Sequence, residues 1–294
     1  MPATVLNNRF YVDWQNAIGQ GGSSEIFQGI DLFSNTGVAI KREKMKEEYV
    51  QPCNSPLTRE FQVYQSLREQ TGFPRIYCFG EVAGYRVMVM ELLGPSLEDL
   101  VVYHGRSLGL QIVSWVACTL LERIEELHEQ SWIHGDIKPQ NFLLDATGDQ
   151  VDIVMIDLGL ARRYRDPQTK EHYPARATYT PLGTPRFASI ARHRGDPCSR
   201  RDDMESLGYL LVYLCRGCLP WQGLDGSIDA KLEQILVSKV RTSPQELCHD
   251  LSPEFLQYFK HISCLEFTDK PDYLGLWKAF DDLHQRCRRG EPHL

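Results

Sequence analysis

The hydrophobic pattern of this 294-residue chain changes once along its length, near residue 94. Before that point, apolar residues alternate with polar ones or form short runs between Gly, Asn and Pro breaks, which predicts strands over 10–18, 25–33, 36–43, 75–82 and 85–92. After it, apolar residues recur at helical spacing over 107–130, 201–216, 227–239, 252–264 and 273–287. This change predicts an α+β fold, with a small β-rich lobe followed by a larger α-helical lobe.

One helix is predicted inside the β-rich part of the chain. The apolar residues Leu57, Phe61, Tyr64 and Leu67 recur there at helical spacing. Gly72 follows them and is expected to end the helix, because glycine is common just after a helix.

The change of pattern also predicts the domain organisation. We expect an N-lobe over about residues 1–92, a hinge at 91–96 and a C-lobe over about 94–294. Residues 157–200 are expected to be rich in loops. A ligand cleft between the two lobes is the natural expectation for such a chain.

The balance of charges and the cysteines bound the partners and the location. The chain carries 32 Lys and Arg against 39 Asp and Glu, a net charge of −7, which argues against nucleic-acid binding. Nine scattered cysteines are typical of reduced thiols inside a cell, and no apolar run is long enough to span a bilayer. We therefore expect a cytoplasmic protein with no membrane partner, and the nucleus stays open as an alternative location. We also expect a monomer.

The segment IGQGGSSEIFQG, residues 18–29, places glycines in a turn between two predicted strands. Without Cβ atoms, Gly19, Gly21 and Gly22 let backbone amides approach phosphate oxygens. Ser24 stands where the pattern G-x-G-x-x-G has its third glycine. Taken alone, the turn is equally typical of an ordinary β-hairpin.

Lys41 ends the apolar run GVAIK, and Glu60 lies on the predicted helix. A lysine at a strand end and a carboxylate on a helix are, taken singly, usually solvated. Together they suggest another arrangement, because an ammonium held by a carboxylate is fixed in direction and can bind nucleotide phosphates.

The segment IHGDIKPQNFLL, residues 133–144, has the spacing D-x-K-x-x-N. Asp136 is suited to accept a hydroxyl proton, Lys138 to stabilise charge on a transferred phosphoryl group, and Asn141 to hold magnesium. Further on, VMIDLGLA places Asp157 between an apolar strand and a glycine, which suits either a metal ligand or a plain turn. The glycine turn, Lys, Glu, D-x-K-x-x-N and D-x-G follow the chain order of the protein-kinase signature.

Longer strings resemble the casein kinase I family of serine/threonine protein kinases: VMVMELLGPSLEDL (87–100), LGTPRFASI (182–190), SRRDDMESLGYLLVYL (199–214), LPWQGL (219–224) and DKPDY (269–273). The resemblance covers residues 10–287 and implies a bilobal protein-kinase domain over that range. It also implies ATP and Mg²⁺ as cofactors. The implied substrates are proteins phosphorylated on Ser or Thr near acidic or already phosphorylated residues.

The resemblance also implies roles for individual residues. Catalysis would rest on Lys41, Glu60, Asp136, Lys138 and Asn141, and magnesium would be held by Asn141 and Asp157. The nucleotide would contact Ile18, Gly19, Gly21, Gly22, Ser23, Ser24, Ile26, Ala39, Lys41, Met90, Glu91, Leu93 and Leu143. Asp203 would brace the catalytic loop by binding its backbone. For Met90 and Leu143, core packing is the alternative.

Arg186 and Arg176 match basic positions at which the family binds a phosphate upstream of the target residue. Tyr179 and Asp225 stand where the family has lysine, and each lost cation weakens a phosphate site. We expect a preference for substrates that already carry a phosphate, although these two replacements weaken the site that would bind it. For Arg186, pairing with a loop carboxylate is the alternative.

Gly135 stands before Asp136, where protein kinases usually have arginine. The glycine is ordinary in small-molecule kinases with a kinase-like fold, but those lack the lysine at 138 and the segment containing Arg186. A catalytically weak pseudokinase that acts as a scaffold is the second alternative, and the retained catalytic lysine and aspartates argue against it. The third is an active kinase without the arginine that pairs with a phosphorylated activation loop.

We expect the third, a constitutively active enzyme. The glycine would cost about 0.5–1 kcal/mol in backbone entropy if its position would also accept alanine.

Overall fold

The computed structural model describes residues 3–21, 24–45, 55–146, 148, 150–175 and 183–291. The chain forms two compact units. The first comprises Met1–Gly94 with Leu143–Gly159, and the second comprises Pro95–Phe142 with Leu160–Leu294. Residues 143–159 thus belong to the unit that contains the N-terminal strands.

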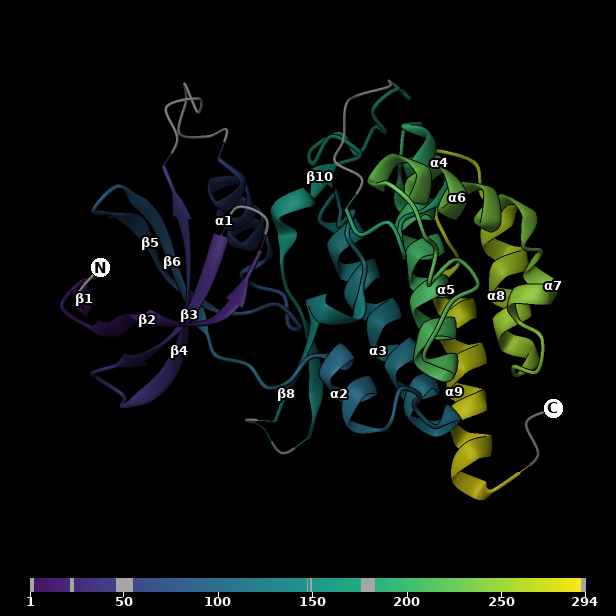
Figure 1. The fold of residues 1–294 in the computed structure, drawn as a ribbon, viewed down its shortest axis with the longest axis horizontal. Helices are drawn as coiled ribbons and strands as arrows, with labels where there is room; N and C mark the ends of the chain where they lie inside the picture. Colours follow the sequence, from purple (N-terminus) through teal and green to yellow (C-terminus); the bar gives the residue numbers. More distant parts are fainter. Residues whose placement is uncertain are drawn as a thin grey trace. The chain divides into compact units, whose positions relative to one another are not determined.

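The first unit is built on a six-stranded antiparallel sheet (Figure 1). Its strands lie in the order β1 (Thr4–Leu6), β2 (Phe10–Gln20), β3 (Ser24–Asp31), β4 (Thr36–Lys44), β6 (Tyr85–Glu91) and β5 (Ile76–Val82). Five of them confirm the predicted strands. The sixth, β1, has three residues and is too short to show a periodicity.

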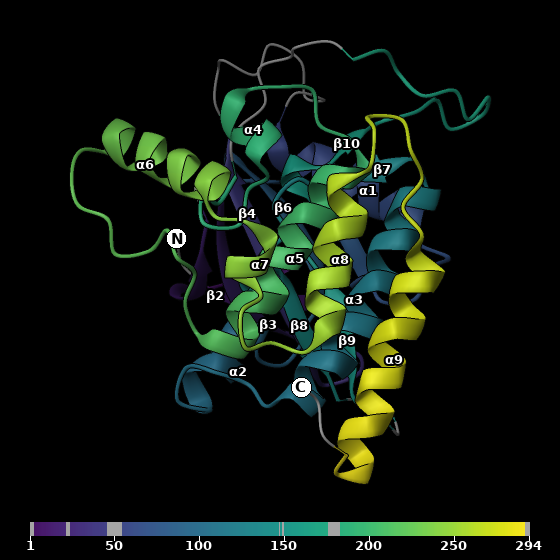
Figure 2. The same ribbon diagram turned by 90° about the vertical axis from the view of Figure 1, so that its right-hand side faces the viewer.

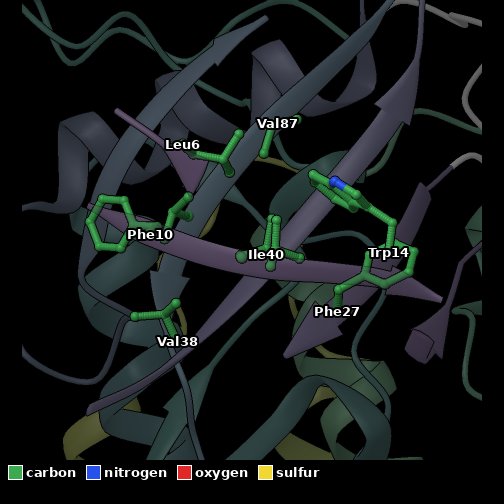
Figure 3. Packing of buried hydrophobic residues seen from close by; sticks show 9 residues of the cluster. Leu6, Phe10, Trp14, Phe27, Val38, Ile40 and Val87 are labelled. Carbon is green, nitrogen blue, oxygen red and sulfur yellow. The ribbon is translucent and has the colours of Figure 1, made fainter. Parts of the chain in front are cut away.

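One face of this sheet carries a hydrophobic core (Figure 3). Its buried members are Leu6, Phe10, Val12, Trp14, Phe27, Val38, Ile40, Val87 and Val89. Phe27 pairs directly with Ile40 across β3 and β4, and the ring of Trp14 meets that of Phe27 edge-on at 5.2 Å. Because side chains alternate along a strand, the adjacent pair Ile26 and Lys41 lies on the opposite face.

Helix α1 (Pro56–Leu67) confirms the helix predicted inside the β-rich part. Ser55 caps its first turn by accepting the backbone N–H of Thr58, and Pro56 stands at the first helical position, where proline is favoured. The prediction that Gly72 ends this helix is wrong, because the helix ends at Leu67. Gly72 lies in the following loop, where its carbonyl accepts the N–H of Met155 at 2.8 Å.

Two further strands form a small separate sheet, β8 (Phe142–Asp145) with β9 (Asp152–Met155). The carbonyl of Leu144 accepts the N–H of Gly94 at 2.8 Å. A side chain at Gly94 would meet this carbonyl, so the glycine permits the close approach of the two backbones.

The second unit is mainly helical (Figure 2). Its helices are α2 (Leu97–Tyr103), α3 (Leu110–Glu129), α4 (Ile190–Arg194), α5 (Arg200–Arg216), α6 (Ile228–Arg241), α7 (Pro244–Leu247), α8 (Pro253–Ser263) and α9 (Tyr273–Arg289). The unit also contains the strand pair β7 (Trp132–Ile133) and β10 (Arg162–Arg163) and the 3-10 turn Pro139–Asn141. A second 3-10 turn, Leu158–Leu160, begins in the first unit, which ends at Gly159. The five longest helices confirm the predicted segments, whereas α2, α4 and α7 were not predicted.

Helix α5 forms the core of the second unit, packing against α3 and α8, while α9 packs along α3 (Figure 2). A Cβ atom at Gly208 would lie 2.7 Å from the ring of Phe259, so this glycine lets α5 and α8 approach closely. Within the described ranges, no helix is long and apolar enough to cross a membrane.

Candidate active site

The first unit contains a buried lysine that is bonded to two carboxylates. Lys41 lies in β4, on the sheet face opposite the hydrophobic core, and is 8% exposed. Its Nζ donates to Glu60 Oε2 at 2.7 Å and to Asp157 Oδ1 at 2.9 Å. The structure thus brings together three predicted residues from β4, α1 and the segment after β9. Glu60 is a buried partner of the lysine and not a solvated helix carboxylate.

Two effects shift the pKa values in this cluster: burial of the charged groups, and the attraction between the lysine and its carboxylate partners. Burial opposes the charge of Lys41, but the carboxylates of Glu60 and Asp157 outweigh it and raise the pKa of the lysine. Burial also raises the pKa of Glu60 to about 7, against the effect of Lys41. Because the Asp157 side chain is 40% exposed, it is the carboxylate better placed to meet a metal ion.

Asp157 has a backbone φ of +62°, which is uncommon for residues other than glycine. Its N–H donates to the hydroxyl of Tyr64 at 3.0 Å, which helps to hold this conformation. Tyr64 lies four residues after Glu60, so one face of α1 positions both groups. The sequence pattern predicted Tyr64 only as a core residue. Its i,i+4 spacing from Glu60 was the signal that could have revealed the second role.

The predicted nucleotide contacts of the sheet share the face of Lys41. Ile26 pairs with Lys41 across β3 and β4, and Ala39 pairs with Met90 across β4 and β6. Ala39 and Met90 are buried, whereas Ile18, near the end of β2, is 54% exposed.

The turn between β2 and β3 and the segment after β6 hold the remaining predicted contacts. Gly21 donates its N–H to the carbonyl of Ser24 at 2.7 Å, while Gly22 and Ser23 lie outside the described residues. The N–H of Glu91 donates to the carbonyl of Arg75 at 2.9 Å. Because this N–H is already bonded, the carbonyl of Glu91 is the backbone group better suited to bind the base of a nucleotide. Among the others, the structure leaves Gly19, Leu93 and Leu143 partly exposed.

A second cluster, in the second unit, surrounds Asp136. One carboxylate oxygen accepts the N–H of Thr184 at 2.7 Å, and the other accepts Lys138 Nζ at 2.6 Å. The side chain of Asn141 donates to the carbonyl of Asp136 at 2.9 Å. The loop therefore brings its three predicted catalytic residues together, with Lys138 directly on the Asp136 carboxylate. The contact from Thr184 was not predicted.

The predicted magnesium ligands have the donor chemistry that this ion prefers. Because Asn141 donates through its amide nitrogen, its amide oxygen is left to face a metal. Asp157 offers a partly exposed carboxylate. Mg²⁺ is usually held by one or two carboxylates and other oxygen donors together with substrate phosphates, so the donor chemistry of each residue by itself fits this ion.

Asp203 of α5 fixes the catalytic loop through its backbone. Its carboxylate accepts the N–H of His134 at 2.6 Å and that of Gly135 at 2.9 Å, which confirms the predicted bracing role. His128 Nε2 lies 2.9 Å from the same carboxylate, and His128 Nδ1 lies 2.6 Å from the hydroxyl of Tyr273. Burial opposes the charge of Asp203, but these hydrogen bonds outweigh it and lower its pKa.

Gly135 is required by its conformation and by its neighbour. Its φ is +80°, and a Cβ atom there would lie 2.6 Å from Nη1 and 2.8 Å from Nη2 of Arg192. The premise that the position would accept alanine is therefore wrong. A guanidinium lies beside the loop after all, but α4 supplies it. Arg192 is 6% exposed, and burial lowers its pKa while Asp203 and Asp136 oppose the shift.

Two arginines were predicted to bind a phosphate of the substrate, and one of them lies among the described residues. Arg186 is half-buried, with its guanidinium 5.6 Å from the ring of Phe187 and 5.5 Å from that of Tyr213. Arg176 lies outside the described residues, as does Tyr179. Asp225 is exposed.

Comparison with known proteins gives two findings. The family model described as "Protein kinase domain" matches residues 12–272. The chain is also similar to casein kinase I homolog 2 of Schizosaccharomyces pombe, with 40% identity over 269 residues, which cover 90% of this chain and 61% of that protein. The chain thus spans about six-tenths of the length of this curated relative.

Proposed function

Because the chain belongs to the protein kinase domain family, we propose that it is a serine/threonine protein kinase of casein kinase I type. It transfers the γ-phosphoryl group of ATP to protein substrates. The observation that carries this proposal is the Lys41 cluster. A buried ammonium held by Glu60 and Asp157 has a fixed direction, which is what binding nucleotide phosphates requires.

On the nucleotide side, Lys41 binds the phosphates and Glu60 keeps it in place. Magnesium, when bound, neutralises phosphate charge, and the carboxylate of Asp157 and the amide oxygen of Asn141 would hold it. The rest of the nucleotide is proposed to contact Ile18, Gly19, Gly21, Gly22, Ser23, Ser24, Ile26, Ala39, Met90, Glu91, Leu93 and Leu143.

On the acceptor side, Asp136 orients the hydroxyl of the substrate and accepts its proton. Its carboxylate is suited to this because Thr184 and Lys138 fix both oxygens. The ammonium of Lys138, 2.6 Å from that carboxylate, would neutralise charge on the transferred group. Phosphoryl transfer depends on such positioning and charge neutralisation more than on covalent chemistry.

We further infer that the enzyme is active without phosphorylation of its activation loop. Gly135 offers no side chain to a phosphate, and the nearby guanidinium of Arg192 is buried. The proposed substrates carry acidic or phosphorylated segments, which Arg186 and Arg176 would bind.

The first experiment compares the full chain with Asp136→Asn in Mg-ATP-dependent transfer to casein or an acidic serine peptide. We expect a loss of about 10²–10⁴-fold in kcat, because the variant lacks the group that accepts the proton. The variant should still melt at a higher temperature with Mg-ATP, since the Lys41 cluster is intact. Asp229→Asn, in the exposed first turn of α6, is the matched control and should leave the rate unchanged.

Each other outcome identifies an alternative. Full activity in Asp136→Asn would contradict the proposed role. No transfer by the parent chain, with Mg-ATP still raising its melting temperature, would favour a pseudokinase scaffold. Transfer to an aminoglycoside or to choline, but not to peptides, would favour a small-molecule kinase.

Substrate preference is tested with paired peptides that differ by a phosphate three residues upstream of the target serine. We expect about a tenfold lower KM for the phosphorylated peptide, because a hydrogen bond between charged groups contributes about 1.5–3 kcal/mol. Arg186→Ala should reduce the difference, whereas Arg194→Ala, exposed on α4, should leave it intact. Equal KM values in the parent chain would refute the preference.

A further inference from the structure

Helix α6 buries a single side chain, and that side chain is a lysine. Lys239 is 3% exposed, although a buried ammonium is costly unless its protons are bonded. Its Nζ donates to the carbonyl of Pro185 at 2.9 Å and to that of Ala188 at 2.5 Å. The rings of Tyr209 and Trp221 lie 4.9 and 5.1 Å from the same nitrogen, within the range of cation–π attraction.

Side chains surround the backbone of residues 184–188, and Lys239 is the central one. We call residues 184–188 the acceptor segment. Trp221 Nε1 donates to the carbonyl of Arg186 at 2.7 Å, and His193 Nε2 lies 3.0 Å from that of Pro185. The carbonyl of Thr184 accepts the N–H groups of Phe187 and Ala188. Side chains from α4, α6 and the loop after α5 thus fix this backbone from outside the segment.

Three ionisable groups face Lys239: His193 on α4, and Glu205 and Tyr209 on α5. His193 Nε2 lies 3.2 Å from the ammonium, and burial together with Lys239 lowers the pKa of this histidine to about 4, so it stays neutral. On α5, Glu205 attracts the ammonium, but its Oε1 accepts the N–H of Ile190 and the hydroxyl of Tyr209. Lys239 therefore bonds to main-chain oxygens, and in the described part of the chain no carboxylate forms an ion pair with it.

The acceptor segment leads directly to the catalytic carboxylate. Thr184 precedes Pro185, and its N–H donates to Asp136 Oδ1 at 2.7 Å. A Cβ atom on the preceding residue, Gly183, would lie 2.8 Å from the same oxygen, so the segment passes close to Asp136. Movement of the Pro185 carbonyl would therefore move the donor that orients Asp136.

We propose that Lys239 is a positioning residue for the acceptor side of phosphoryl transfer. By binding the carbonyls of Pro185 and Ala188, it fixes the segment that orients Asp136 and seats the acceptor residue of the substrate. This role rests on the proposed kinase function. It predicts that loss of Lys239 changes the handling of the peptide substrate and leaves ATP binding unaffected.

The test substitutes Lys239→Met in the full chain, because methionine has a similar length and suits an apolar cage but donates no hydrogen bond. We expect kcat for an acidic serine peptide to fall about tenfold and KM for ATP to stay within twofold of the parent value. Lys239→Arg, which keeps the charge and the donors, should recover part of the loss. Lys231→Met, exposed on the same helix, is the matched control and should behave like the parent.

Hydrogen exchange supplies a readout that does not depend on activity. In Lys239→Met, the amides of Thr184 and of residues 186–190 should exchange faster, while those of α3 and α5 keep their protection. Unchanged kcat and unchanged exchange would overturn the proposal. So would a rise in both KM values with faster exchange throughout the second unit, which is the mark of a purely structural role. If the parent chain transfers no phosphate, the proposed function is wrong, and local exchange alone decides whether Lys239 holds the segment.

Discussion

The space beside Gly135 is filled by the guanidinium of Arg192, which comes from α4. Asp136 and Asp203 both favour the charged form of this buried arginine. The glycine before Asp136 therefore leaves room for a cation from another element. The sequence could not show this, because no local pattern links residues of the catalytic loop and α4.

The pairing of Gly135 with Arg192 predicts a large effect for a small substitution. Gly135→Ala should lower the free energy of unfolding by about 2–4 kcal/mol, because it adds steric conflict with a buried side chain to the strain of a left-handed backbone. We also expect kcat to fall at least tenfold, since the backbone of this loop positions Asp136. Urea unfolding and peptide kinetics measure the two effects.

A second glycine separates the two causes. Gly84 has nearly the same backbone conformation, with φ +82°, but no atom lies within 4 Å of its would-be Cβ. Gly84→Ala should therefore show the cost of backbone strain alone, about 1 kcal/mol, without the loss of activity. Equal costs for the two alanine variants would show that Arg192 yields easily and that the pairing is unimportant.

At the scale of elements, length decided what the sequence could predict. The strands β2 to β6 and the helices α1, α3, α5, α6, α8 and α9 sustain a hydrophobic period, which is a local property of the chain. Helices α4 and α7, with five and four residues, are too short to show one. Helix α4 depends instead on packing, since its cap Ser189 also bonds to Asp202 of α5.

The short helix α2 did carry a sequence signal that the hydrophobic period does not capture. Ser96 and Asp99 form a reciprocal capping box, with the side chain of each bonded to the backbone N–H of the other. The spacing of a serine and an acidic residue before an apolar run was visible in the sequence. Local capping chemistry therefore predicts elements that are too short for a period to emerge.

The residues of the candidate site also fall into two groups, those that a sequence motif predicts and those that only the fold brings into contact. The pairing of Lys41 with Glu60 and the cluster around Asp136 could be predicted, because the protein-kinase signature has these residue types in a fixed order along the chain. The contact of Lys239 with the carbonyl of Pro185 could not be predicted, because only the folded chain creates it. For Tyr64, the spacing from Glu60 was a signal, but only the folded chain shows the hydrogen bond to Asp157. Residues that do chemistry leave motifs, whereas the residues that position them often look like core or surface positions.

For the molecule as a whole, groups buried without full compensation make stability depend on pH. Lys239 has its pKa lowered from 10.5 to about 7 by burial, with Glu205 opposing the shift. Between these two values the unfolded chain keeps the proton and the folded chain loses it, so the contribution of Lys239 to stability rises with pH. His193, whose pKa burial lowers to about 4, acts in the same direction but below pH 6.5.

This linkage predicts a pH-dependent difference between the parent chain and Lys239→Met. From pH 7 to pH 9 the parent should gain about 2 kcal/mol in free energy of unfolding relative to the variant, because only the parent has this group to titrate. Urea unfolding of both proteins at the two pH values measures the change, and ionisable groups that do not interact with Lys239 cancel in the difference. Lys231→Met replaces a solvent-exposed lysine. The difference in free energy of unfolding between the parent and this variant should therefore be the same at both pH values. A difference between the parent and Lys239→Met that stays constant with pH would mean that Lys239 keeps its proton in the folded state, and that burial in the ring-and-carbonyl cage stabilises the ammonium fully.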